Sequence, residues 1–203
     1  NIGTDSDRAL LLDFQTTLET KPEKAIKLEK DAFAQIETIT ADNARLVSNL
    51  HANLGGLYRM NGHPDLAREH MEKSISLLDQ FNLLHINDSI PQIANYAMFL
   101  TEQQEPERGI SELQKLSGII KEYHSDDCLD YAKVQETLGT IYLMTANLPQ
   151  AKTHFKRAFK IYEKIWADEP EMIEAKYQEI QELYPQIGFS IGKTLSGLLT
   201  KQT

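Results

Sequence analysis

The sequence has little of what several functional classes require. Its 203 residues include a single cysteine, Cys128, so neither an intramolecular disulfide nor a zinc site built from cysteines can form. Lys and Arg number 21 against 30 Asp and Glu, which gives a formal net charge of -9. A nucleic-acid backbone or an anionic membrane surface selects for clustered basic residues. We therefore expect neither nucleic acid nor a membrane as the partner of this segment.

Long apolar runs and targeting signals are also absent. No stretch of about 18 consecutive apolar residues occurs that would span a bilayer, and the first residues lack the basic and apolar regions of a signal peptide. The single cysteine favours a reducing compartment, and the predicted location is the cytoplasm. The sequence begins with Asn1 rather than methionine. We therefore interpret it as a trimmed chain or a piece of a longer one, and leave open whether a further domain precedes Asn1.

Three local patterns resemble catalytic or metal sites but lack the partners that the chemistry needs. Residues 188–192 fit G-x-S-x-G, the nucleophile elbow of hydrolases, but no Asp, Glu or His follows Glu182 to serve as a base. Residues 192–194 end like a phosphate-binding loop, but Ile187 stands where that loop needs glycine. No two of the six histidines are three or four residues apart, as a metal site on one helix face requires. We predict no enzyme activity, no cofactor and no metal site.

What the sequence does contain is an internal repeat with a period of 42 residues. Similar residues recur at this spacing: Leu54-Gly55, Tyr96-Ala97 and Leu138-Gly139 in one segment, then Ala67, Gly109 and Ala151 in the next. Prolines 22, 64 and 106 keep the same period, and Pro149 comes one residue late. Proline is tolerated in the first turn of a helix because its missing N–H would be unpaired there. Each proline therefore predicts the start of a second helix after a short turn.

The apolar residues between these prolines recur at helical intervals. Spacings of three and four join Leu50, Leu54, Leu57 and Tyr58, and likewise Val134, Leu138, Ile141 and Tyr142. The first unit is less regular, because Asp13 stands where a small residue is expected. We nevertheless predict helices over residues 5–19 and 23–38. One more helix is predicted over residues 172–184, closed by Pro185.

The pattern resembles the tetratricopeptide repeat, whose signature is W-x2-L-G-x2-Y followed by A-x3-F. The clearest matches are Leu54-Gly55-x2-Tyr58 with Ala67-x3-Met71, and Leu138-Gly139-x2-Tyr142 with Ala151-x3-Phe155. The signature tryptophan is replaced by His51, Ile93 and Gln135, and the middle unit is degenerate. The period exceeds the usual 34 residues and is similar to the variant found in kinesin light chains and bacterial regulators.

The resemblance implies an all-α fold, a right-handed superhelix of about four helix hairpins followed by C-terminal capping helices. The solenoid is assigned to residues 5–184, with repeats at about 6–47, 48–89, 90–131 and 132–173. Residues 185–203 are predicted to form a C-terminal capping or docking helix. Its apolar stripe recurs every four residues: Ile187, Ile191, Leu195 and Leu199. Such a helix would cover the exposed end of a stack, as solenoids require.

The resemblance also predicts where a partner binds. Stacked hairpins curve, and their first helices line the concave side. In the family, an asparagine of the first helix commonly holds the backbone of a bound peptide; that position carries Asn53 and Asn95, and Thr137 in the third matching unit. By periodicity, the same face carries Asn49, Arg59, Met60, Met98, Glu102, Lys133, Glu136 and Met144. The alternative for both asparagines is that they bond within the stack and orient its helices.

The predicted function is therefore a non-catalytic module that binds a protein or peptide in its concave groove and acts as a scaffold or adaptor. An alternative is the ligand-sensing half of a bacterial, peptide-responsive transcriptional or signalling regulator. A third possibility is self-association through the C-terminal helix, for which the size of the protein would depend on concentration.

Overall fold

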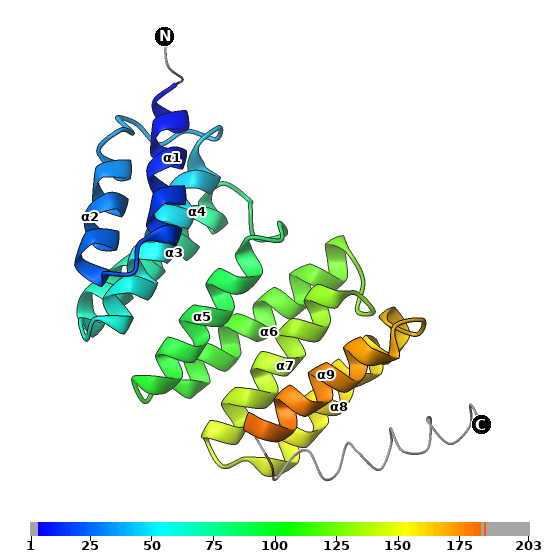
Figure 1. Cartoon of the computed structure of the whole chain (residues 1–203). Helices are drawn as coiled ribbons and strands as arrows, with labels where there is room; N and C mark the ends of the chain where they lie inside the picture. The colour runs from blue at the N-terminus through cyan, green and yellow to red at the C-terminus, as the bar shows by residue number, and fades with distance from the viewer. Residues whose placement is uncertain (1–3, 184, 186–203) are drawn as a thin grey trace. The chain divides into compact units, whose positions relative to one another are not determined.

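The structure is a computed structural model that describes residues 4–183 and 185 (Figure 1). These residues form nine helices and no strand. The helices are α1 (Asp5–Leu18), α2 (Pro22–Phe33), α3 (Ala44–Met60), α4 (Pro64–Gln80), α5 (Ser89–Glu102), α6 (Pro106–Tyr123), α7 (Leu129–Met144), α8 (Leu148–Ile165) and α9 (Pro170–Leu183). The predicted all-α class is confirmed. Apart from residue 185, the predicted C-terminal helix lies outside the described residues.

The chain divides into two compact units. The N-terminal unit extends to Glu112, and the C-terminal unit begins at Leu113. In the N-terminal unit α1 packs on α2, α3 on α4, and α2 and α4 each contact the helix that follows. In the C-terminal unit α7 packs on α8, which also contacts α9. The assignment of residues 5–184 to a single solenoid stays a prediction.

The starts of the second helices and the turns before them follow the 42-residue period. The first residues of α2, α4 and α6 are prolines, and Pro149 is the second residue of α8. The turns before three of these helices each contain one residue in the left-handed region: Gly62 (φ 75°), Gln104 (φ 65°) and Ala146 (φ 59°). Glycine adopts this conformation readily, whereas Gln104 and Ala146 are held in it by the surrounding hairpin.

One predicted helix is shorter in the structure. The helix expected over residues 23–38 ends at Phe33. Residues 36–40 read Ile-Glu-Thr-Ile-Thr, and β-branched side chains lose rotamer freedom in a helix. The helices predicted over residues 5–19 and 172–184 are confirmed as α1 and α9, although residue 184 is not described.

Small residues set the distance between the helices of each hairpin. A Cβ atom at Gly55 would lie 2.6 Å from Met71 Cγ, and one at Gly139 would lie 2.9 Å from the Phe155 ring. Both values are too short for a real contact, so α3 and α7 approach α4 and α8 only because these positions lack side chains. Leu54 and Leu138, next to the two glycines, are almost completely buried.

Candidate functional site

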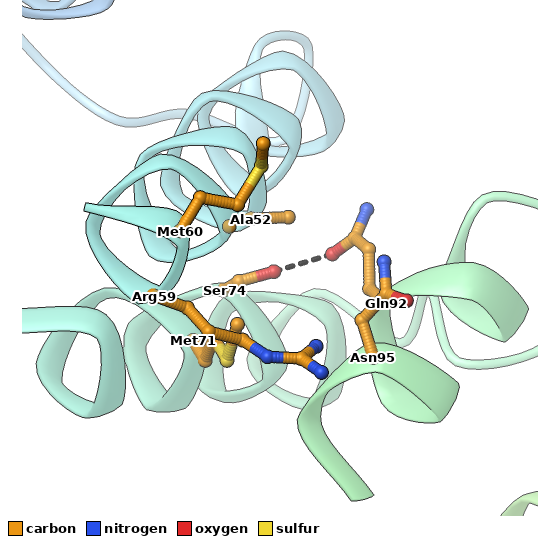
Figure 2. Close-up of a pocket in the computed structure, with 8 residues that line it drawn as sticks. Ala52, Arg59, Met60, Met71, Ser74, Gln92 and Asn95 are labelled. Atoms are coloured by element: carbon orange, nitrogen blue, oxygen red, sulfur yellow. Dashed lines mark hydrogen bonds between the residues drawn. The ribbon is translucent and has the colours of Figure 1, made fainter. Parts of the chain in front are cut away.

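The N-terminal unit contains a pocket of about 240 Å³ between α3, α4 and α5 (Figure 2). Its lining residues are Ala52, Gly56, Arg59 and Met60 of α3, Met71 and Ser74 of α4, and Gln92 and Asn95 of α5. The two small residues of α3 leave this space open, because a Cβ atom at Gly56 would meet nothing within 4 Å. The pocket therefore has room for a side chain or backbone from outside.

The floor of the pocket is a buried polar network centred on Gln92. The Ser48 hydroxyl donates to Gln92 Oε1 at 2.7 Å, and the Ser74 hydroxyl donates to the same oxygen. Figure 2 shows the bond from Ser74. Gln92 Nε2 donates to Asn49 Oδ1 at 2.6 Å. Each polar group thus has a partner, as burial demands, and the network fixes α3, α4 and α5 relative to one another.

Asn95 and Met60 have side chains available to a ligand. Asn95 is exposed and lines the pocket, and no hydrogen bond to its amide is found within the described part of the chain. Met60 is 81% exposed. Arg59 and Glu102, both also predicted for the binding face, instead pair with each other: Arg59 Nε donates to Glu102 Oε2 at 2.8 Å, and a second bond joins Arg59 Nη2 to Glu102 Oε1. This pair joins α3 to α5.

Asn53, although it is one repeat from Asn95, is already engaged inside the unit. Its Nδ2 donates to Asp13 Oδ1 at 2.7 Å and to Glu29 Oε1 at 3.2 Å. These bonds join α3 to α1 and α2. Asn53 is therefore bonded within the stack, which was one of the two interpretations left open by the sequence, whereas Asn95 lines the pocket.

Asp13 and Glu29 stand where the other repeats carry a small residue and a large apolar residue. One period later the same positions carry Gly55 and Met71. Glu29 is fully buried, and its Oε2 has no hydrogen-bond partner within the described residues. Burial, reinforced by the neighbouring Asp13 carboxylate, raises the pKa of Glu29 to about 8. At neutral pH Glu29 is therefore mostly protonated and donates a hydrogen bond to Asp13.

Replacing Asn53 with alanine should destabilise the N-terminal unit. The substitution removes the two hydrogen bonds to Asp13 and Glu29. Because Glu29 is fully buried, leaving its Oε1 without this donor costs about 1–3 kcal/mol. Thermal melts followed by circular dichroism should show a lower Tm, with protection from hydrogen exchange lost first in α1 and α2. An unchanged melt would mean that Asn53 does not hold these helices.

Of the remaining predicted binding residues, Met98 is half-buried on α5, and the others lie on α7 in the C-terminal unit. Glu136 accepts hydrogen bonds from the Tyr162 hydroxyl at 2.6 Å and from Lys176 Nζ at 3.1 Å, so α9 already occupies it. Thr137 donates to the Lys133 carbonyl within its own helix. Lys133 lies 3.6 Å from Asp130 in an exposed ion pair, and Met144 is exposed. On α7, therefore, Met144 and Lys133 offer the accessible side chains.

Comparisons with known proteins support the predicted repeat. Residues 89–164 match the family model described as tetratricopeptide repeat. This segment carries tetratricopeptide repeats. A search of curated proteins gives no significant match to the sequence.

Solved structures show the same fold. A crystal structure of BtubC (BKLC) from P. vanneervenii is similar with a TM-score of 0.71 and 16% identity, covering 95% of this chain and 80% of that one. A protein of Podosopora anserina, described as a kinesin light chain with nearly identical TPR-like repeats, is similar with a TM-score of 0.60 and 14% identity over 71% and 68% of the two chains. A second crystal structure, of a point variant of that protein, gives a TM-score of 0.62 at 14% identity, with 72% and 69% coverage. The predicted tetratricopeptide-repeat solenoid is confirmed as the fold.

No metal site accompanies these tetratricopeptide repeats in the described part of the chain, where no three His, Cys, Asp or Glu side chains are grouped to hold an ion. His51 and His70 contact each other instead, with 2.9 Å between their Nδ1 atoms. Burial lowers the pKa of His51 to about 4 and also lowers that of His70, so both are neutral at pH 7. The G-x-S-x-G and phosphate-loop patterns lie outside the described residues.

Sequence reasoning missed two features of the tetratricopeptide repeats. The first is the Gln92 network, although a signal existed: Gln92 stands at a position that is Leu50 one period earlier and Val134 one period later. A polar residue at an apolar position of a repeat needs buried partners. The second is the pairing of Lys176 with Glu136, for which the period gives no signal because α9 follows the last repeat.

Within the described residues, no helix has both the length and the apolar character needed to cross a bilayer.

Tetratricopeptide repeats are in general non-catalytic modules for protein–protein interaction.

Proposed function

We propose that the chain binds a peptide segment of a partner protein in the pocket of α3, α4 and α5, and acts as a scaffold or adaptor. The observation that supports this most directly is the side chain of Asn95, which lines an open pocket while its counterpart Asn53 is bonded inside the unit. The single cysteine favours the cytoplasm as the location of this interaction.

The residues of the pocket suit a peptide backbone. A side-chain amide both donates and accepts hydrogen bonds, so Asn95 can pair with the backbone of an extended chain whatever its sequence. Opposite it, Gly56 offers no side chain that would keep a backbone away. Met60 adds a flexible apolar surface that adapts to different side chains.

The size of the pocket also argues for a peptide rather than a cofactor. Pockets for small molecules and cofactors usually measure about 300–1,000 Å³, whereas this one is about 240 Å³. A space of that size accepts one or two side chains. The remaining affinity must then come from a surface that extends along the first helices, as in a groove.

A matched pair of variants, Asn95→Ala and Asn53→Ala, tests the proposal. Peptides selected on the parent chain from a displayed random library serve as probes, and their affinity is measured by calorimetry. Asn95→Ala should weaken binding by about 1–2 kcal/mol, roughly 5–30-fold, because a hydrogen-bonding group of the ligand is left unpaired. Its melting temperature should match that of the parent, because the Asn95 amide has no bond to lose inside the described residues.

The control should behave in the opposite way. Asn53→Ala should lower the melting temperature, and any loss of affinity should disappear when binding is measured well below that temperature. If Asn95→Ala binds the selected peptides as tightly as the parent does, the pocket is not the binding site and the proposal fails.

A further inference from the structure

Helix α8 concentrates positive charge in a chain that is acidic as a whole. It contains five basic residues and one acidic residue, Glu163, whereas the whole chain has 21 basic and 30 acidic residues. Four of the basic residues are four residues apart and form one row along the helix. This lysine row consists of Lys152, Lys156, Lys160 and Lys164. The last three lysines are exposed, and Lys152 is partly exposed.

The repeat does not require lysine at these positions. In the preceding repeat, none of the residues at the positions of Lys156, Lys160 and Lys164 is basic: they are Gln114, Gly118 and Glu122. Like charges four residues apart on a helix repel one another and destabilise it. The lysine row therefore lowers the stability of α8, and a bound partner of opposite charge would offset that loss.

Two carboxylates of the same unit already contact this face of α8. Asp127 accepts a hydrogen bond from Lys164, and the Asp126 carboxylate lies 3.9 Å from Arg157. Both acids belong to the segment that precedes α7, and their side chains remain about half exposed. These contacts show which chemical group the basic face of α8 accepts, namely a carboxylate.

The rest of the lysine row is free. No hydrogen bond or ion pair is found for Lys152, Lys156 or Lys160 within the described part of the chain. Successive lysines of the row are about 6 Å apart along the helix axis, because four residues rise about 1.5 Å each. Alternate residues of an extended segment point to the same side and are about 6.6–6.8 Å apart. An extended segment with an acid at every second position therefore matches the spacing of the lysines.

We propose that the lysine row binds an extended acidic segment of a partner protein, in which Asp or Glu occupies every second position. Other anionic partners fit this surface less well. The net charge of -9 repels the continuous negative charge of a nucleic acid. A helix that lies on a membrane exposes apolar residues, whereas the apolar face of α8 is buried in its own unit. The inference does not rest on the pocket of α3, α4 and α5.

Two synthetic peptides of equal composition test the spacing. In one peptide four glutamates alternate with four serines, and in the other the four glutamates are consecutive. Binding to the full chain is followed by NMR titration at low salt. The alternating peptide should bind at least about threefold more tightly, because each well-placed exposed ion pair contributes about two- to fivefold in affinity. The largest shifts should occur at backbone amides of α8, and binding should weaken as salt is added.

Two triple variants with the same change in net charge test the site. Replacing the three free lysines, Lys152, Lys156 and Lys160, with glutamine should weaken binding of the alternating peptide about 10–100-fold. Its melting temperature should equal or exceed that of the parent, because repulsion along α8 is reduced. The control replaces Lys21, Lys24 and Lys27, which are exposed at α2, and should change the affinity less than about twofold.

A third variant should gain affinity. Asp126→Asn/Asp127→Asn releases Arg157 and Lys164 from their internal partners and should bind the alternating peptide about two- to fivefold more tightly. Asn95→Ala should leave this binding unchanged, even if it abolishes binding in the pocket of α3, α4 and α5.

Four outcomes would overturn the proposal. Equal weakening by the two triple variants would mean that net charge alone attracts the peptide. Equal affinity for the two peptides would contradict the match in spacing. Tighter binding of a single-stranded oligonucleotide, or of vesicles that contain anionic lipid, at the same salt would assign the surface to another class of partner. Absence of shifts in α8 at millimolar peptide would mean that the lysine row is only a solvated face.

Discussion

Replacing Gly109 with alanine is expected to destabilise the N-terminal unit by about 2–3 kcal/mol, because overpacking moves the backbone. A Cβ atom at Gly109 would lie 2.6 Å from the Ala97 carbonyl oxygen, a backbone atom. At Gly55 the nearest atom belongs to the flexible Met71 side chain, so Gly55→Ala should cost less. Urea denaturation of both variants beside the parent measures the difference. Equal stability of Gly109→Ala and the parent would contradict the close approach of α5 and α6.

A second substitution should not rescue the first. In two repeats the first helix carries glycine and the second carries alanine, as in Gly55 with Ala67. The middle repeat has the reverse order, Ala97 with Gly109. The double variant Ala97→Gly/Gly109→Ala restores the common order but keeps the Ala97 carbonyl oxygen that the new Cβ atom meets, so it should be no more stable than Gly109→Ala. Recovery of most of the lost stability would show that the Ala97 side chain, and not its backbone, makes the contact.

Raising the pH from 5 to 9 is expected to weaken the packing of α1 and α2. The pKa of Glu29 is about 8 in the folded chain, above its ordinary value of 4.5. Between these values the folded state holds a proton that the unfolded state has released, so stability falls as pH rises. The full loss is on the order of 3–5 kcal/mol. Melts at several pH values, with hydrogen exchange of α1 and α2, measure it.

Glu29→Gln is the matched control for this pH dependence. Glutamine keeps a donor toward Asp13 but does not titrate, so the variant should melt at nearly the same temperature at pH 6 and pH 9. His51 makes the stability depend on pH in the acidic range instead. Because its pKa in the folded chain is lowered to about 4, the stability that the neutral His51 side chain contributes is complete above about pH 6.5 and is lost as pH falls toward 4. If the Glu29→Gln variant keeps the alkaline loss, another group is responsible.

The helices and their register could be predicted from the sequence because the residues that recur with the period, prolines and small residues, have strong effects on local structure. Prolines begin three second helices where expected, and small residues stand at the close contacts of the hairpins. The end of α2 was missed because the apolar pattern continues through Ile36 and Ile39, while β-branched residues there favour other conformations.

The roles of the site residues were less predictable. Periodicity places Asn53 and Asn95 at one repeat position but does not show their neighbours. Asn53 is bonded because Asp13 and Glu29, at 40 and 24 residues before it, depart from the repeat. Asn95 faces no such pair. Differences of this kind arise from packing between hairpins, which a single repeat does not encode.

Site-specific photocrosslinking tests the central claim, that partner segments bind in the pocket of α3, α4 and α5. A photoreactive phenylalanine analogue at Met60, which is 81% exposed at the pocket, should crosslink to the displayed-library peptides selected on the parent chain. The same analogue at Lys73, an exposed residue of α4 that pairs with Glu69 outside the pocket, is the control and should give little product. Crosslinking from Lys73 that equals or exceeds that from Met60 would contradict the claim.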